Sequence, residues 1–179
     1  MPEIGRLQRL DDPALLRGLA ALLVDAVDGG ASVSFMAPLA PDRALAWWQG
    51  LAPAVAAGER LLLVARHDDG RVAGSVQLLL SQPENQPHRA DLAKLLVHRS
   101  ERRSGLGERL MRAAEQAALA AGKTLLVLDT AGAEAGRLYA RLGWQHVGVI
   151  PDFALWPDGR PCATTLFFKA LAPAASAGH

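Results

Sequence analysis

Two helices are predicted in the first sixty residues, where helix start and stop signals enclose mostly apolar stretches. In residues 11–30, an Asp-Asp-Pro sequence supplies an N-cap and a proline for the first turn, and Gly29-Gly30 ends the helix. A second helix is expected over residues 41–59, kinked or broken at Pro53. On this pattern, both helices precede every strand.

Strands are predicted from residue 60 onward. Residues 60–81 hold two apolar runs around Asp69-Gly70, a dipeptide that favours the positive φ angles of a tight hairpin turn. After a polar loop, residues 89–98 form a third apolar run whose alternation is imperfect. Such a run is typical of a central strand buried on both faces.

A helical pattern begins at Gly105 and ends at Gly122, with apolar residues recurring every three or four positions. Beyond it we expect a strand over residues 123–130, a short helix that stops at Gly143, and two final strands. These last two strands are expected over residues 144–155 and 162–171.

The order of these elements defines the fold class. A strand, a helix and a strand through residues 89–130 imply a parallel strand pair with a right-handed crossover. Because the other strands are expected in hairpins, the prediction is an α/β (α+β) domain with a mixed, mostly antiparallel sheet flanked by helices. One domain is expected over residues 1–171, followed by a poorly periodic tail over residues 172–179.

Composition narrows the functional classes. The 179 residues include 19 Lys and Arg and 18 Asp and Glu, so the net charge of +1 gives no general attraction to nucleic acid or acidic membranes. Apolar runs are shorter than the roughly 20 residues of a membrane helix. The single cysteine, Cys162, forms no internal disulfide or CxxC metal motif, and the N-terminus lacks signal-peptide features. We therefore expect a cytoplasmic protein without a metal.

The segment "ERRSGLGERLM", residues 101–111, joins the central strand to the long helix. First-turn amides have no intrahelical partners, and the helix dipole adds positive potential, so this junction predicts an anion site. Glycines allow a phosphate to approach the backbone, and Arg102 and Arg103 lie at the rim. The segment matches neither a Walker A motif nor GxGxxG. The two glycines could also serve only to end one element and start the next.

Arg102-x-x-Gly105-x-Gly107 resembles the acetyl-CoA pyrophosphate loop of the GNAT N-acetyltransferase superfamily. The segment "LYARLGW", residues 138–144, resembles the second signature of that family, and the element order matches from about residue 4 to 170. The local sequence is also similar to small-molecule acetyltransferases of the tabtoxin-resistance type. The resemblance implies a GNAT-like sheet with a splayed parallel strand pair.

The resemblance also implies the cofactor site. Acetyl-CoA, as cosubstrate, is expected against the loop and first helical turn, and the backbone amide of Leu96 or Val97 is expected to bind the developing oxyanion. The cofactor-binding residues expected on this basis are Leu96, Val97, Arg102, Arg103, Ser104, Gly105, Leu106, Gly107 and Glu108.

Two side chains are expected to carry the chemistry. The resemblance assigns the proton donor for the leaving thiolate to Tyr139, which could otherwise be a half-buried packing residue. Asp129 ends a strand beside the expected acetyl site, where it could take a proton, hold the ammonium group of the acceptor, or cap the following helix. His98 has a suitable ordinary pKa but fits a surface or capping role better. Loop residues His88, Glu84 and Asp152 are weaker candidates.

The expected function is acetyl transfer from acetyl-CoA to the primary amine of a small, amino-acid-like or antibiotic-like molecule. Residues 32–38 lie where this family often builds one wall of the acceptor pocket, and Trp47 or Trp48 could line its entrance. The alternatives are acetylation of a protein N-terminus or lysine, and a CoA-binding module without catalysis. The resemblance also allows a homodimer.

Overall fold

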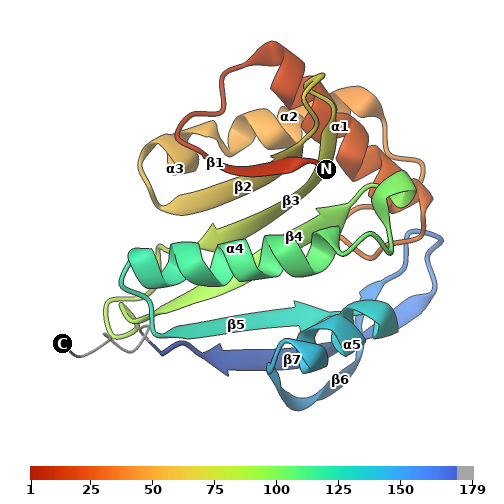
Figure 1. Ribbon diagram of the computed structural model, residues 1–179. Coiled ribbons are helices and arrows are strands. Elements are labelled where there is room, and N and C mark those ends of the chain that lie inside the picture. The colour runs from red at the N-terminus through yellow and green to blue at the C-terminus, as the bar shows by residue number, and fades with distance from the viewer. Residues whose placement is uncertain (173–179) are drawn as a thin grey trace.

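A computed structural model describes residues 1–172 as a twisted sheet with helices on both faces (Figure 1). In chain order the elements are β1 (Glu3–Leu7), α1 (Pro13–Asp28), α2 (Pro41–Gly50), α3 (Ala52–Ala56), β2 (Arg60–Arg66), β3 (Val72–Leu79), β4 (Arg89–Val97), η1 (Arg99–Glu101), α4 (Leu106–Ala120), β5 (Leu125–Thr130), α5 (Ala133–Arg141), β6 (Gln145–Leu155) and β7 (Pro161–Ala170). The strand order is β1-β2-β3-β4-β5-β7-β6.

All neighbouring strands pair antiparallel except β4 and β5, which pair parallel. Helix α4 provides the connection between these two strands and lies across the sheet (Figure 1). The predicted fold class, a mostly antiparallel mixed sheet with one parallel pair, is therefore confirmed.

Two apolar layers enclose the sheet. On one face, α4 packs Leu106, Leu110 and Met111 against the strands, and Tyr139 belongs to the same cluster. On the other face, α1 and α2 form a second cluster with β2, in which Trp48 is fully buried. Because alternate residues of a strand face opposite ways, β2 contributes to both clusters.

The expectation that two helices precede every strand is wrong. Residues 3–7 form β1, which pairs antiparallel with β2 from Glu3 opposite Arg66 to Leu7 opposite Leu62. This short edge strand is largely exposed and shows little apolar alternation, so its conformation depends on pairing with a segment some sixty residues away.

The helix boundaries follow the local signals. Asp12 caps α1, its carboxylate accepting a hydrogen bond from the Ala14 amide at 2.8 Å. The expected break in the second helix divides it into α2 and α3, with Pro53 in the first turn of α3. In the hairpin between β2 and β3, Gly70 has φ of 86°, as an Asp-Gly turn requires.

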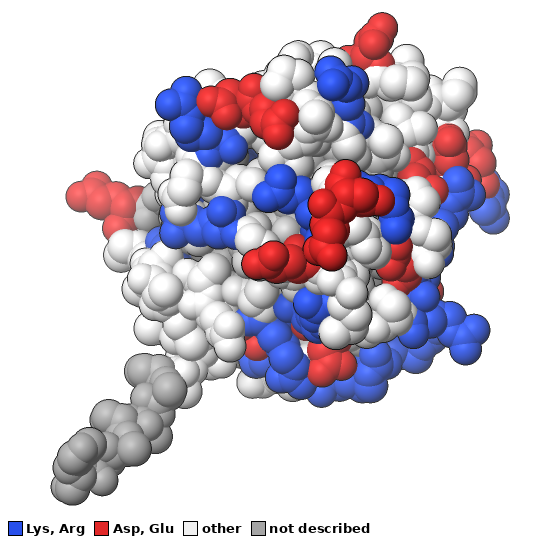
Figure 2. All heavy atoms as spheres, turned by 45° about the horizontal axis from the view of Figure 1, so that its top comes forward, with Lys and Arg blue, Asp and Glu red and all other residues white. Residues whose placement is uncertain are grey.

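Positive and negative side chains are interspersed over the face shown in Figure 2. Among residues 1–172, no helix has the length and apolar character needed to cross a membrane. The tail predicted from Ala172 lies, apart from that residue, outside the described part of the chain.

Candidate active site

The parallel strands β4 and β5 diverge along their length. Their ladder joins only Arg89 to Leu125, Ala90 to Leu126 and Asp91 to Val127. Beyond these pairs, β4 continues beside β3 alone and β5 continues beside β7 alone. The sheet therefore opens in its interior, at the carboxyl ends of both strands.

A β-bulge strengthens this divergence. The register between β3 and β4 shifts between Ser75 and Gln77, which pair with Leu96 and Ala93. Lys94 lies in the extra segment and has φ of 52°, a left-handed conformation that is unusual for lysine. The bulge bends β4, and Lys94 lines the cavity into which the gap opens.

The gap leads into a cavity of about 520 Å³. Its walls are the end of β4, the end of β5, helix α5, the loop between α1 and α2, and the β6–β7 hairpin. The residues that define these walls are Ala31–Met36, Leu92–Leu95, Leu128–Gly132, Ala135, Tyr139, Phe153–Trp156 and Cys162–Thr164. The loop expected to form a pocket wall thus does so over residues 32–36, whereas Trp47 and Trp48 do not line the cavity.

Asp129 faces this cavity from the end of β5. The Thr164 hydroxyl of β7 donates a hydrogen bond to Asp129 Oδ2 at 2.7 Å, so one oxygen is held in place. The carboxylate does not cap α5, whose N-cap is Gly132 without a side-chain hydrogen bond. Of the three roles considered for Asp129, the helix cap is therefore excluded, and the two roles of a carboxylate that faces the cavity remain.

Tyr139 reaches the same cavity from α5 and is only 5 % exposed. Its ring packs against Trp144 and Phe167, with centroids 6.0 and 5.7 Å away. Burial, together with the negative charge of Asp129, raises the pKa of the Tyr139 phenol far above its ordinary value. The phenol is therefore neutral and keeps its proton at physiological pH.

The glycine loop forms an uncapped helix N-terminus. Gly105 is the N-cap residue of α4 and has φ of 81°, which glycine adopts without a steric penalty. No side chain caps the first turn, so the amides of Leu106, Gly107 and Glu108 are left to bind an external acceptor. A pyrophosphate fits this geometry and the positive end of the helix dipole.

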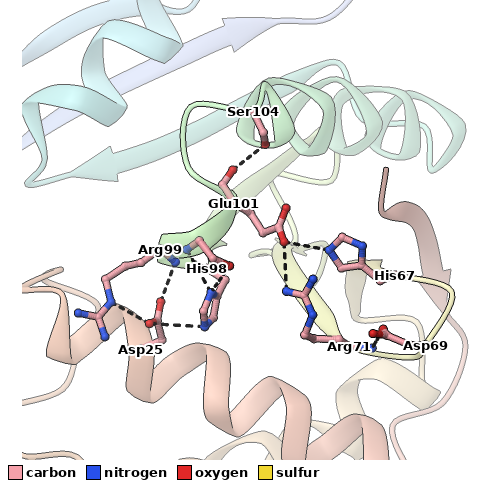
Figure 3. A network of polar contacts seen from close by, with 9 residues as sticks. Asp25, His67, Asp69, Arg71, His98, Arg99, Glu101 and Ser104 are labelled. Carbon is pink, nitrogen blue, oxygen red and sulfur yellow. Dashed lines mark hydrogen bonds and ion pairs between the residues drawn. The ribbon is translucent and has the colours of Figure 1, made fainter.

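Both carboxylates beside this loop are bound by cations. Glu108 pairs with Arg112 at 2.8 Å. Glu101 accepts hydrogen bonds from His67 at 2.9 Å and Arg71 at 3.1 Å, and these contacts lower the pKa of its carboxyl (Figure 3). Repulsion of a bound anion is thereby reduced.

A second contact fixes the start of the loop. In Figure 3, Asp25 of α1 accepts hydrogen bonds from the Arg99 backbone amide at 2.9 Å and from Arg99 Nε at 2.8 Å. Although burial opposes it, this bonding lowers the pKa of the Asp25 carboxyl. In the described residues Arg102 and Arg103 join no ion pair, so both guanidinium groups are available at the loop.

The two candidate oxyanion donors differ in direction. The His98 amide donates to the Ala73 carbonyl of β3 at 2.9 Å. Successive amides of a strand point to opposite edges, so Leu96 N–H also points to β3 and Val97 N–H points into the gap. Val97 therefore offers the amide on the side where β5 no longer pairs.

The weaker candidates are not brought to the cavity. His98 caps η1, its ring nitrogen Nδ1 accepting from the Ser100 amide at 3.2 Å, which is the capping role that the sequence favoured. His88, Glu84 and Asp152 are absent from the cavity walls. Among residues 1–172, no three His, Cys, Asp or Glu side chains form a group that could hold a metal ion.

Sequence reasoning missed two residues of the site. Lys94 lines the cavity and donates a hydrogen bond from Nζ to Ser34 Oγ at 2.8 Å. Thr164 orients Asp129 from a strand 35 positions further along the chain. Neither belongs to a local motif, and the only signal for Lys94 was a charged residue within the apolar segment 92–97 of β4.

Comparisons with known proteins agree with this geometry. An N-acetyltransferase of Azospirillum brasilense, encoded between hisH and hisA and described as uncharacterized, is 37% identical over 107 residues. That match spans 59% of this chain and 61% of the length of the relative.

Two solved structures share the fold. YncA from Salmonella typhimurium, solved with its cofactor acetyl-CoA, gives a TM-score of 0.74 at 20% identity, covering 98% of both chains. A ribosomal-protein-alanine N-acetyltransferase from Brucella melitensis gives a TM-score of 0.76 at 21% identity, covering 94% of this chain and 99% of its own. The model of the acetyltransferase (GNAT) family matches residues 31–144, and the chain belongs to that family.

Proposed function

We propose that this protein is an N-acetyltransferase that transfers the acetyl group of acetyl-CoA to the primary amine of a small molecule. The observation that carries the proposal is the gap between β4 and β5, which opens into a cavity that Asp129 and Tyr139 both face. A cofactor entering this gap from the α4 N-terminus would bring a thioester to these two side chains.

The cofactor is assigned to the uncapped loop and the unpaired edge of β4. Its pyrophosphate binds the first-turn amides of α4, with Arg102 and Arg103 adding charge and Ser104 completing the loop. The acetyl oxygen accepts a hydrogen bond from Val97 N–H. Family membership and the acetyl-CoA held by the fold neighbour YncA support this assignment.

The acceptor amine must be neutral to attack the thioester. It therefore has to lose a proton first, because an alkyl ammonium has an ordinary pKa of roughly 10. The Asp129 carboxylate holds the ammonium and receives its proton directly or through water. The amine nitrogen forms a bond to the acetyl carbon, and the oxyanion of the tetrahedral intermediate is stabilised by the Val97 amide. The carbon–sulfur bond then breaks, the nitrogen loses its second proton, and the CoA sulfur becomes a thiol.

Tyr139 is assigned as the donor to the departing sulfur. Because its pKa lies above the ordinary thiol value of about 8.5, complete proton transfer to the thiolate is uphill unless the phenolate is reprotonated. Transfer of the phenol proton to the sulfur, with the second proton of the acceptor nitrogen passing to the phenol oxygen in the same step, avoids a buried phenolate beside Asp129. The role is therefore donation in the transition state.

A small acceptor is favoured because the cavity is walled on several sides by residues 31–36 and by the β6–β7 hairpin. Fold alone does not select the acceptor, since the Brucella neighbour is named for acetylation of a protein alanine. A polypeptide acceptor is the second candidate within this activity. The cytoplasmic setting and the homodimer stay predictions.

The decisive experiment measures thiol release from acetyl-CoA with a panel of small primary amines and with peptides that carry a free N-terminus or lysine. Mass spectrometry should show one acetyl group on the amine. Asp129→Asn serves as the active-site control, and Arg6→Met, on the exposed far edge of the sheet, serves as the surface control. Binding of CoA without transfer to any acceptor would instead support a non-catalytic module, and transfer to peptides alone would replace the small acceptor.

A further inference from the structure

We propose that the acceptor carries an anionic group in addition to its amine, and that Lys94 binds this group. The inference rests on the proposed function, because it assigns the acceptor class of the same cavity. It makes the acceptor an amino carboxylate, phosphonate or phosphinate rather than a simple amine.

The charges of the cavity carry the first step. Among the residues that line it, Lys94 and Asp129 are the only ones with charged side chains, and they belong to opposite sides of the gap. No ion pair within 4.0 Å joins Lys94 to any carboxylate of residues 1–172. The cavity therefore presents one cation and one anion that do not neutralise each other by direct contact.

Lys94 has only weak partners in the protein. Its ammonium donates to the Ser34 hydroxyl and lies 5.7 Å from the centre of the Trp47 ring. Burial lowers the pKa of the Lys94 ammonium, the Asp129 charge opposes that shift, and Arg60 adds to it. A partly buried cation with no close counter-ion is costly. An anionic ligand group would offset this cost.

Three polar side chains lie on the α1 and α2 face of β2 and β3. Arg60 donates to the Gln77 side-chain oxygen, and in residues 1–172 neither Arg60 Nε nor Gln77 Nε2 has a partner. The buried Ser75 hydroxyl also lacks one. Arg60, Ser75 and Gln77 are at alternating positions of β2 and β3 that share the α1 and α2 face. These three residues do not line the cavity, and the Arg60 charge acts on Lys94 by lowering the pKa of its ammonium.

The shape of the acceptor follows from this charge arrangement. Its amine must lie near Asp129 and the thioester, while its anionic group lies near Lys94. Phe35, Met36 and Phe153 provide apolar surface in the cavity, so an apolar or mixed body fits between the two charged ends. An amine without an anionic group would leave Lys94 without a counter-ion in a closed complex.

The experiment compares Lys94→Met with the wild type on matched acceptors: leucine and leucinamide, methionine and methioninamide, and aminomethylphosphonate. Met keeps the length of the side chain and the left-handed strain of this position while removing the charge. Lys94→Arg retains the charge, and Arg6→Met removes a positive charge from the opposite edge of the sheet. The readout is kcat/KM of each acid divided by that of its amide, compared between variant and wild type, because the different nucleophilicity of the two amines cancels in that comparison.

We expect Lys94→Met to lower this ratio about 10- to 100-fold, as loss of a charge-assisted contact does, with KM for acetyl-CoA unchanged and the melting temperature not lowered. Lys94→Arg should recover most of the preference, and Arg6→Met should not alter it. An unchanged ratio in Lys94→Met, with amines still acetylated, overturns the inference and leaves the proposed function standing. Absence of acetyl transfer to every primary amine tested overturns the proposed function itself. A preference restricted to the phosphonate identifies the anionic group as a phosphorus oxyanion.

Discussion

Replacing Tyr139 with Phe separates chemistry from packing at the centre of the cavity. The ring contacts with Trp144 and Phe167 are retained, and in the described residues no hydrogen bond joins the hydroxyl to another group. The free energy of unfolding should therefore change by less than about 1 kcal/mol. Tyr139→Ala, which deletes a buried ring, should cost about 3–5 kcal/mol and is the less informative variant.

The effect on turnover should be much larger. Loss of a positioned donor lowers the rate about 10²- to 10⁴-fold, which corresponds to about 2.7–5.5 kcal/mol of activation free energy. Because the donor acts chiefly in the transition state, kcat should fall while KM for acetyl-CoA changes little. The assay is thiol release at saturating acetyl-CoA and acceptor, with single-turnover measurements to show that chemistry limits the rate.

An unchanged single-turnover rate in a folded Tyr139→Phe protein would refute the assignment. Water or backbone dipoles would then have to stabilise the leaving thiolate. A fall in rate accompanied by an equal loss of stability would point to distortion of α5, and solvent isotope effects would distinguish that result from loss of a proton donor.

Three further predictions follow from the same geometry. Gly105→Val places a β-branched residue at φ of 81°, so it should raise KM for acetyl-CoA at least 10-fold in a folded protein, measured beside the milder Gly107→Ala. Asp129→Asn should lower kcat/KM for the acceptor about 100-fold and leave the affinity for acetyl-CoA intact. Thr164→Val, which removes the hydrogen bond to Asp129, should lower kcat/KM for the acceptor by a smaller factor. Wild-type kinetics in both variants would show that the carboxylate takes no part in the mechanism. Because burial raises the pKa of Tyr139, the folded chain retains a proton that the unfolded chain releases above about pH 10, so stability should fall by up to about 1.4 kcal/mol per pH unit there. Urea titrations at pH 9 and 11 should show this component in the wild type and lack it in Tyr139→Phe.

The parts of the site that sequence could predict are those encoded locally. The glycine loop and the helix after it are adjacent in the chain, so the N-terminal anion site follows from the order of residues 101–111. Tyr139 was predicted through a short signature, and the structure brings it to the cavity with Asp129. Their roles in the reaction stay predictions.

The parts that sequence missed depend on distant pairing. The β1 strand forms because residues 3–7 complete the edge of β2, a contact that no local pattern encodes. Lys94 faces the cavity because a bulge inserts a positive φ at a residue that rarely adopts one. The Thr164 contact with Asp129 requires the pairing of β5 and β7, which is also not written in either strand alone.

The short ladder between β4 and β5 has a consequence for the stability of the unliganded chain. Three residue pairs join the two halves of the sheet, so the remaining length of β4 presents an unpaired edge in the interior of the domain. A cofactor lying along this edge would take the place of a neighbouring strand. At a cofactor concentration 100 times the dissociation constant, binding would raise the free energy of unfolding by about 2.7 kcal/mol. Amide hydrogens that face the gap, that of Val97 among them, should then exchange quickly with solvent in the free protein and slowly when the cofactor is bound, because binding completes the pairing of the β4 edge.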